Sequence, residues 1–307
     1  TTLSFWISPN SLISPSMSQA TSYDGEVVYK TVIKSDYVIN DQLSLEFKKH
    51  FKYRSEQDDE LVQWSYLVAC STTDIAANRA CEIKDNILSK LDDFLLISSF
   101  AARKRTSCLG WDAYDDNFIT SFYRGNYAFP EQSDDDTNHT LIEKYNAHQF
   151  IDIALSSFNQ YSNQLSLRNA LFSVLPSKNN NLETLFLKSF TALETLLLEY
   201  KRIENIEFVL PNESWKKLKH GLKKSIKNSE VELTTDQRSL IYGKLEELNR
   251  VSLRDAYNSF CIKYKLDVSD LWPIFSKKNT ASLSDIRNRL IHGDPFSNDG
   301  LEVLVVA

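Results

Sequence analysis

The chain has 307 residues, of which 42% are hydrophobic, so it can bury a sizeable core and is long enough for two ordinary domains. Only 7 Gly and 7 Pro argue against a turn-dense sandwich or barrel and favour a helix-rich protein. The net charge of -6 does not point to a nucleic-acid binder, although a local patch of Lys and Arg would suffice for one.

The chain carries four cysteines, Cys70, Cys81, Cys108 and Cys261. They lack the close pairs of a zinc site and the density of a disulfide scaffold. No apolar run approaches the roughly 20 residues that cross a bilayer, and no segment resembles a secretory signal. We therefore expect a soluble, cytoplasmic protein with reduced thiols, no membrane partner, no metal and no cofactor.

The first part of the chain has the patterns of strands and of one helix. Residues 24–70 alternate apolar and polar positions in several places, which predicts a small sheet. Residues 73–102 have apolar positions three or four apart, which predicts one long helix. The aromatic-rich segment 106–129, interrupted by Gly110 and Gly125, predicts two or three short strands or an irregular packed loop.

The polar segment 130–138 predicts a linker between two domains. We place the boundary there, with an N-terminal mixed domain over 1–135 and an all-helical domain over 136–307. The predicted helices of the second part span about 140–165, 166–175, 181–202, 213–227, 233–265 with a break, and 283–292. The fold class is therefore α+β, a mixed N-terminal domain followed by a helical bundle.

The central helix of the predicted bundle carries an apolar seam that indicates core packing. The seam consists of Leu182, Leu185, Phe186, Phe190, Leu193, Leu197 and Tyr200.

The last predicted helix, 283–292, has clear start and stop residues. Ser282 and Asp285 stand three apart, as in a capping box with Asp in place of Glu, and Gly293 is suited to end the helix. At about 100° per residue, one face turns into the core and a second face turns away from it. The first face holds Leu283, Ile286 and Leu290. The second holds Arg287, Asn288, Ile291 and His292, and the Ile among these polar groups suggests that a partner covers it.

The polar face carries groups that cleave phosphodiester bonds. Arg287 stays charged and can hold a phosphate by two hydrogen bonds. His292 lies at the negative end of the helix dipole, where a protonated imidazole is favoured. Cleavage through the 2′-hydroxyl of RNA needs a base and an acid on opposite sides of phosphorus, so one His is poorly placed for both. A symmetric dimer would supply two copies of each group.

The string Arg287-Asn-Arg-Leu-Ile-His292-Gly resembles the motif of the HEPN superfamily, an Arg followed by a polar residue and, after four to six intervening residues, a His. Upstream, Phe190-Thr-Ala-Leu-Glu194-Thr-Leu-Leu resembles the helix that carries "ALE" in these domains. The likeness covers about 140–307. Members of the family normally continue with a helix after the motif, so we expect the domain to be truncated in this chain.

The resemblance implies a dimerising helical bundle and, as in many members, a metal-independent ribonuclease of toxin–antitoxin systems, abortive infection or other antiviral defence. Arg287 would bind or activate the phosphate, Asn288 would orient it, and His292 would be the acid or base. The family gives no secure role to Glu194.

A basic amphipathic helix is predicted around Trp215. Its candidate RNA-binding residues are Lys216, Lys219, Lys223 and Lys224. The same charges would also suit a solvated face of a bundle helix, and both interpretations remain open.

Three hypotheses remain for the function. The first is a dimeric RNA endonuclease whose N-terminal domain recognises a trigger or a partner protein. The second is a catalytically silent HEPN module that serves as a dimerisation or nucleotide-binding scaffold. In the third, the motif is accidental and His292 is buried within one subunit of a helical adaptor.

Overall fold

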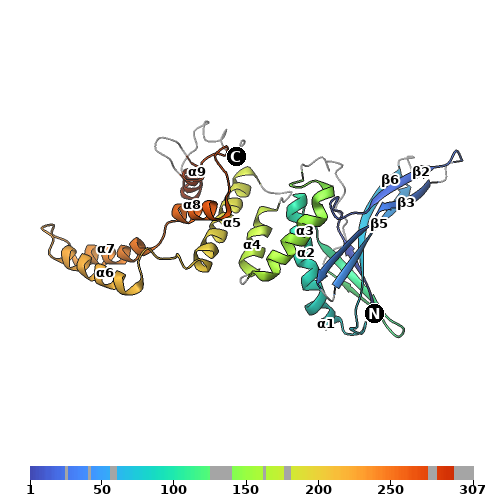
Figure 1. Cartoon of the computed structure of the whole chain (residues 1–307), viewed down its shortest axis with the longest axis horizontal. Coiled ribbons are helices and arrows are strands. Elements are labelled where there is room, and N and C mark those ends of the chain that lie inside the picture. The colour runs from blue at the N-terminus through green and yellow to red at the C-terminus, as the bar shows by residue number, and fades with distance from the viewer. Residues whose placement is uncertain are drawn as a thin grey trace. The chain divides into compact units, whose positions relative to one another are not determined.

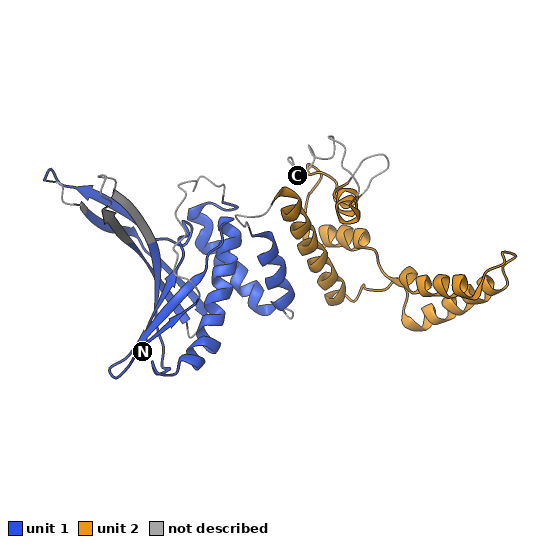
Figure 2. Cartoon of the chain, turned by 180° about the vertical axis from the view of Figure 1, so that it is seen from behind, with its two compact units in different colours: residues 1–180 blue, residues 181–307 orange. Residues whose placement is uncertain are grey.

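The computed structural model describes residues 1–24, 27–40, 43–55, 61–124, 140–161, 164–175, 181–275 and 282–293. They form strands and helices, which confirms the α+β class. The chain divides into two compact units, residues 1–180 and residues 181–307 (Figure 2). The division lies beyond the predicted boundary at 135, which falls inside unit 1. The whole of the predicted linker, 130–138, lies outside the described residues.

Unit 1 is built on a six-stranded antiparallel sheet with strand order β4-β5-β6-β1-β7-β8. In β1, every second side chain is buried, as expected for a strand with one face on a core. This strand lies inside the sheet, between β6 and β7, although the sequence analysis predicted no strand at these residues. The strands are β1 (Thr2–Ile7), β4 (Ser35–Asn40), β5 (Leu43–Ser55), β6 (Leu61–Thr72), β7 (Cys108–Tyr114) and β8 (Ile119–Tyr123).

Two further strands form a separate antiparallel ribbon, β2 (Ser16–Thr21) with β3 (Val27–Ile33). Val28, Val32 and Ile33 are exposed. The alternation of this segment therefore predicted a strand correctly but not its place, because period 2 does not say which sheet a strand joins.

One face of the six-stranded sheet is covered by helices (Figure 1). A continuous helical segment runs through α1 (Ala80–Ile83), the π-helical turn η1 (Lys84–Leu88) and α2 (Ser89–Ala102). It starts later than the predicted residue 73. Phe94 of α2 is buried against Tyr37 and Phe47, and Trp111 of β7 is also fully buried in this core.

Two helices that were expected in the second domain belong to unit 1. They are α3 (Ala147–Gln160), preceded by the 3-10 turn η2 (Lys144–Asn146), and α4 (Gln164–Val174). Both pack against α2. The α3 side chains Ile151, Leu155 and Phe158 join the same core as the sheet, and Leu167 and Leu171 of α4 pack against it.

The described regular elements of unit 2 are helices, apart from a single β-bridge between Phe208 and Arg250. In this unit α5 packs against α8 and α9, and α6 packs against α7. The predicted break within 233–265 is the turn η3 and the residues after it. The helices are α5 (Leu182–Ile203), α6 (Asn212–Lys227), α7 (Thr235–Leu245), η3 (Glu246–Asn249), α8 (Leu253–Tyr264) and α9 (Leu283–His292).

The seam predicted along α5 is buried towards its C-terminal end. Phe190, Leu197 and Tyr200 are buried, and Tyr200 lies edge-on to Phe260 of α8. At the other end, Leu182 is 42% exposed, so the predicted seam is not buried along its whole length. Among the described residues, no helix is both long and apolar enough to span a bilayer.

Candidate functional site

The helix that carries the motif begins and ends where its local sequence predicts. The Ser282 side chain accepts a hydrogen bond from the Asp285 backbone N–H at 3.3 Å, and the Asp285 carboxylate accepts one from the Ser282 N–H at 2.9 Å. Gly293 follows with a left-handed φ of 71°, which glycine adopts at little cost. The bounds predicted for α9, 283–292, are confirmed.

The two faces of α9 also follow the helical period. Ile286 is buried in unit 2, with Leu283 and Leu290 half-buried beside it. Asn288 and His292 are exposed, and Ile291 is 52% exposed. Because Asn288 and His292 are four residues apart, they are neighbours on one side of the helix. In this single chain His292 is therefore on the surface and not buried within the subunit.

Arg287 is half-buried and is held in place by α5. Its Nη2 donates a hydrogen bond to Glu194 Oε2 at 3.2 Å and lies 3.1 Å from Oε1. Its Nη1 donates to Asn288 Oδ1 at 3.1 Å, and the guanidinium carbon lies 5.9 Å from the centre of the Phe190 ring. These contacts fix the guanidinium plane between α5 and α9.

Glu194 is the functional candidate that sequence reasoning left without a role. It lies 93 residues before Arg287 in the chain, so only the packing of α5 on α9 brings the two together. The one sign in the sequence that Glu194 could have a role was its position in the stretch that resembles the "ALE" helix of HEPN domains. Carboxylate pairing both orients the guanidinium and competes with a phosphate for it.

A cavity of about 560 Å³ opens beside this pair, between α5, α8 and α9. Two arginines and two carboxylates line it, so its formal charges balance. The Asp255 carboxylate accepts a hydrogen bond from Ser252 Oγ at 2.7 Å at the start of α8. The lining residues are Phe190, Glu194, Ser252, Leu253, Arg254, Asp255, Phe275, Ser284, Arg287 and Asn288. The structure thus brings Arg287 and Asn288 to one cavity, while His292 lies further along α9 and is not part of the lining.

The predicted RNA-binding lysines all lie on α6, but three of them contact neighbouring side chains. Lys216 forms an ion pair with Glu213 at 3.1 Å, and Lys219 forms one with Glu246 of η3. Lys223 Nζ lies 5.2 Å from the centre of the Tyr242 ring of α7. Lys224 is exposed. The acidic partners reduce the positive potential that a phosphate backbone would meet on this face.

No group of three His, Cys, Asp or Glu side chains that could hold a metal ion occurs within the described ranges. Asp112 accepts a hydrogen bond from Ser121, and Asp115 accepts hydrogen bonds from backbone N–H groups, so both carboxylates have structural partners.

Comparison with protein-family models, curated proteins and solved structures finds no match to this chain. The HEPN resemblance therefore depends only on the sequence of α9 and of the α5 stretch around Glu194.

Proposed function

We propose that the chain is a metal-independent RNA endonuclease of the HEPN type. Arg287 binds the scissile phosphate, Asn288 orients it, and His292 transfers a proton. The observation that carries the proposal is that Arg287 and Asn288 line one solvent-accessible cavity while His292 is exposed one helical turn beyond Asn288 on the same side of α9. The resemblance suggests antiviral defence, by abortive infection or as the toxin of a toxin–antitoxin system.

The chemistry requires no group beyond these side chains and the RNA. The 2′-oxygen forms a bond to phosphorus as the bond from phosphorus to the 5′-oxygen breaks, which leaves a 2′,3′-cyclic phosphate. One imidazole takes the proton of the 2′-hydroxyl, and an imidazolium on the far side of phosphorus gives its proton to the departing 5′-oxygen. Arg287 stabilises the charge that develops on the phosphoryl oxygens.

A second copy of the chain would supply the second imidazole. The exposed Ile291 lies next to His292 in sequence, on a face of α9 turned away from the core of unit 2. A two-fold axis beside Ile291 would cover this side chain in both copies and bring two His292 residues to one cleft. In this arrangement, Glu194 acts as a positioning residue that holds Arg287 at the rim of the cavity.

Other parts of the chain have supporting roles in the proposal. Of the four candidate lysines, Lys216 and Lys224 are exposed, and Lys216 forms an ion pair with Glu213, so Lys224 is the best placed to contact an RNA backbone. Unit 1 is the candidate for recognising a trigger or partner protein, since the β2–β3 ribbon exposes Val28 and Val32. The free thiols suit the reducing cytoplasm as the site of action.

The decisive experiment compares His292→Ala and Arg287→Ala with the matched variant Arg289→Ala in RNA cleavage by the full chain and in toxicity with and without virus infection. Arg289 is exposed on α9 and does not line the cavity. Loss of the acid–base group should reduce cleavage at least about 100-fold, whereas Arg289→Ala should stay within about twofold. Thermal unfolding of each variant shows that the fold is intact. Wild-type protein that never cuts RNA, or equal cutting by His292→Ala, would contradict the proposal.

A non-catalytic HEPN scaffold for dimerisation or nucleotide binding is the second candidate. The ion pair with Glu194 favours it, because in this chain the guanidinium already has an anionic partner. Under this hypothesis, biological activity persists when Arg287 and His292 are replaced together by Ala. Under the nuclease hypothesis it is lost.

A further inference from the structure

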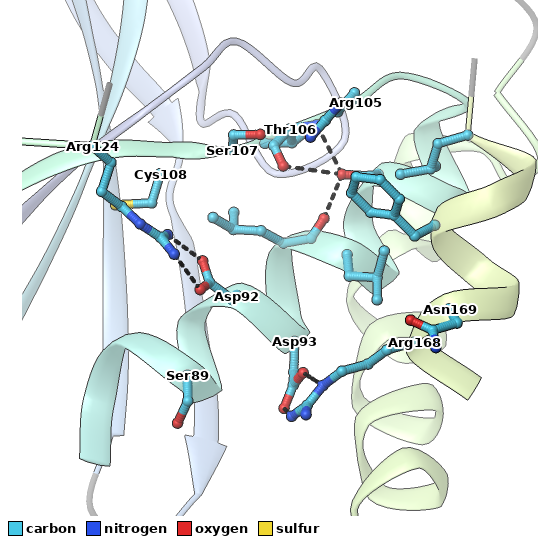
Figure 3. A pocket seen from close by; sticks show the side chains of 15 residues that line it. Ser89, Asp92, Asp93, Arg105, Thr106, Ser107, Cys108, Arg124, Arg168 and Asn169 are labelled. Carbon is cyan, nitrogen blue, oxygen red and sulfur yellow. Dashed lines mark hydrogen bonds and ion pairs between the residues drawn. The ribbon is translucent and has the colours of Figure 1, made fainter. Parts of the chain in front are cut away.

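Unit 1 contains a second charged cavity, of about 540 Å³, that the proposed nuclease chemistry does not use (Figure 3). It lies between α2, α4, the segment before β7 and the end of β8. Three arginines line it, and each comes from a different part of the chain: Arg105 before β7, Arg124 after β8 and Arg168 on α4. The fold brings these three arginines together, and the sequence alone does not show that they are neighbours.

Two adjacent carboxylates of α2 fix two of these guanidinium groups. Arg124 donates to both oxygens of Asp92 at 2.7 and 2.9 Å, and Arg168 donates to both oxygens of Asp93 at 2.6 and 2.7 Å. Figure 3 shows the two arginines reaching α2 from different sides. A guanidinium has five N–H groups and each of these pairs uses two, so donors remain for an anion in the cavity. The carboxylates thus orient the arginines.

The third arginine lies on an aromatic surface. The Arg105 guanidinium carbon is 4.6 Å from the centre of the Phe172 ring, and Phe172 is 51% exposed. Within the described part of the chain, no carboxylate forms an ion pair with Arg105. Three guanidinium groups and two carboxylates leave the lining with one net positive charge, in a chain whose net charge is -6. The cavity therefore favours an anion, with a cationic and aromatic stack at its edge.

The one thiol of the lining is not suited to covalent chemistry. Burial raises the pKa of Cys108 to about 12, so it stays protonated at neutral pH. The same cavity has apolar wall positions at Leu96 and Leu175, beside its charged groups. A volume within the range of small-molecule sites, with a few convergent polar groups on a partly apolar wall, is typical of binding.

We propose that this cavity binds a nucleotide, with its phosphates on Arg105, Arg124 and Arg168 and its base against Phe172. The phosphate part follows from Arg105, the lining guanidinium that has no carboxylate partner within the described residues, and from the N–H donors that Arg124 and Arg168 keep beside their carboxylate pairs. The base part follows from the exposed aromatic ring, on which any nucleobase can stack. The proposal does not depend on RNA cleavage, because the cavity lies wholly within unit 1.

The test measures binding of ATP and of pyrophosphate to the full-length chain by titration calorimetry, with three substitutions. Arg105→Gln should weaken ATP binding about 10- to 100-fold, as expected for loss of a charge-assisted contact. Phe172→Leu should weaken ATP binding and leave pyrophosphate binding unchanged. The matched control Arg103→Gln removes the same charge at an exposed position outside the cavity and should stay within about twofold of wild type. Thermal melting checks that each variant is folded.

A fourth variant separates this site from α9: Arg287→Ala should bind ATP as wild type does. Four results would overturn the proposal. They are no ATP binding at concentrations up to about 1 mM, equal weakening by Arg103→Gln, pyrophosphate binding as tight as ATP binding, and loss of ATP binding in Arg287→Ala.

Discussion

The two units differ in how completely they bury their own apolar side chains. In unit 1 a continuous core lies between the sheet and the covering helices, and large side chains such as Phe5, Phe94 and Trp111 are fully buried in it. Unit 2 has a smaller set of buried apolar side chains in its described residues: Phe190, Ala192, Leu197, Tyr200, Trp215, Leu245, Ala256 and Ile286.

Unit 2 also exposes large apolar side chains on several helices, among them Leu240, Ile262 and Ile291. Buried apolar area is the main source of folding free energy, so a helical unit with a thin core is less stable by itself. From this comparison we expect unit 1 to be the more stable of the two by itself, and the proposed dimer would add buried apolar area to unit 2.

The largest effect is expected in the core of unit 1. Phe94→Ala should reduce the free energy of unfolding by about 3–5 kcal/mol, because it leaves a cavity beside Tyr37 and Phe47. The matched change in unit 2, Phe260→Ala, should cost about 1–2 kcal/mol, since Phe260 is only half-buried. Urea unfolding followed by hydrogen exchange reports on peptides of each unit separately. Equal costs in the two units would remove the contrast between them.

A second pair of substitutions tests where unit 1 ends. Arg168→Met should cost about 2 kcal/mol, because it leaves the Asp93 carboxyl, only 4% exposed, without its ion pair. Arg124→Met should cost less than about 1 kcal/mol, since the Asp92 carboxyl is 40% exposed and remains hydrated. Both are measured by urea unfolding. If Arg168→Met costs no more than Arg124→Met, α4 is not firmly part of unit 1.

A substitution on α9 tests the expected partner contact of unit 2. Ile291→Asp should change the stability of the single chain by no more than about 0.5 kcal/mol, because the side chain is exposed. It should nevertheless abolish the proposed dimer, since a carboxylate would be buried in an apolar contact. Sedimentation velocity measures the oligomeric state, with Ile262→Asp on α8 as the control. Two variants that sediment alike would place the dimer contact elsewhere.

The smallest effect concerns a turn of unit 1 at acid pH. Backbone N–H groups of Ala77, Asn117 and Phe118 donate to the Asp115 carboxylate, each at 2.9 Å, and hold its pKa below the ordinary range. A lowered pKa stabilises the fold above about pH 4, and this contribution is lost as the pH falls through the lower folded-state value. Asp115→Asn should therefore flatten the fall of melting temperature of unit 1 between about pH 4 and pH 3. An unchanged slope would show that other carboxyl groups cause the fall.

The sequence by itself determined the elements whose rules are local. The bounds of α9 follow from Ser282, Asp285 and Gly293, because a cap joins residues only a few positions apart. The exposure of Asn288 and His292 was likewise predictable, because it depends on the helical period alone. The bounds of α5 were predicted to within one residue of Leu182–Ile203.

Only the tertiary structure decided the long-range partners. Arg287 pairs with Glu194 across 93 residues, and Arg168 pairs with Asp93 across 75 residues, which assigns α4 to unit 1. The alternation of β3 likewise did not reveal that it joins β2 in a separate ribbon. Periodicity states which side of an element is apolar, but the surface that this side meets depends on how the whole chain packs.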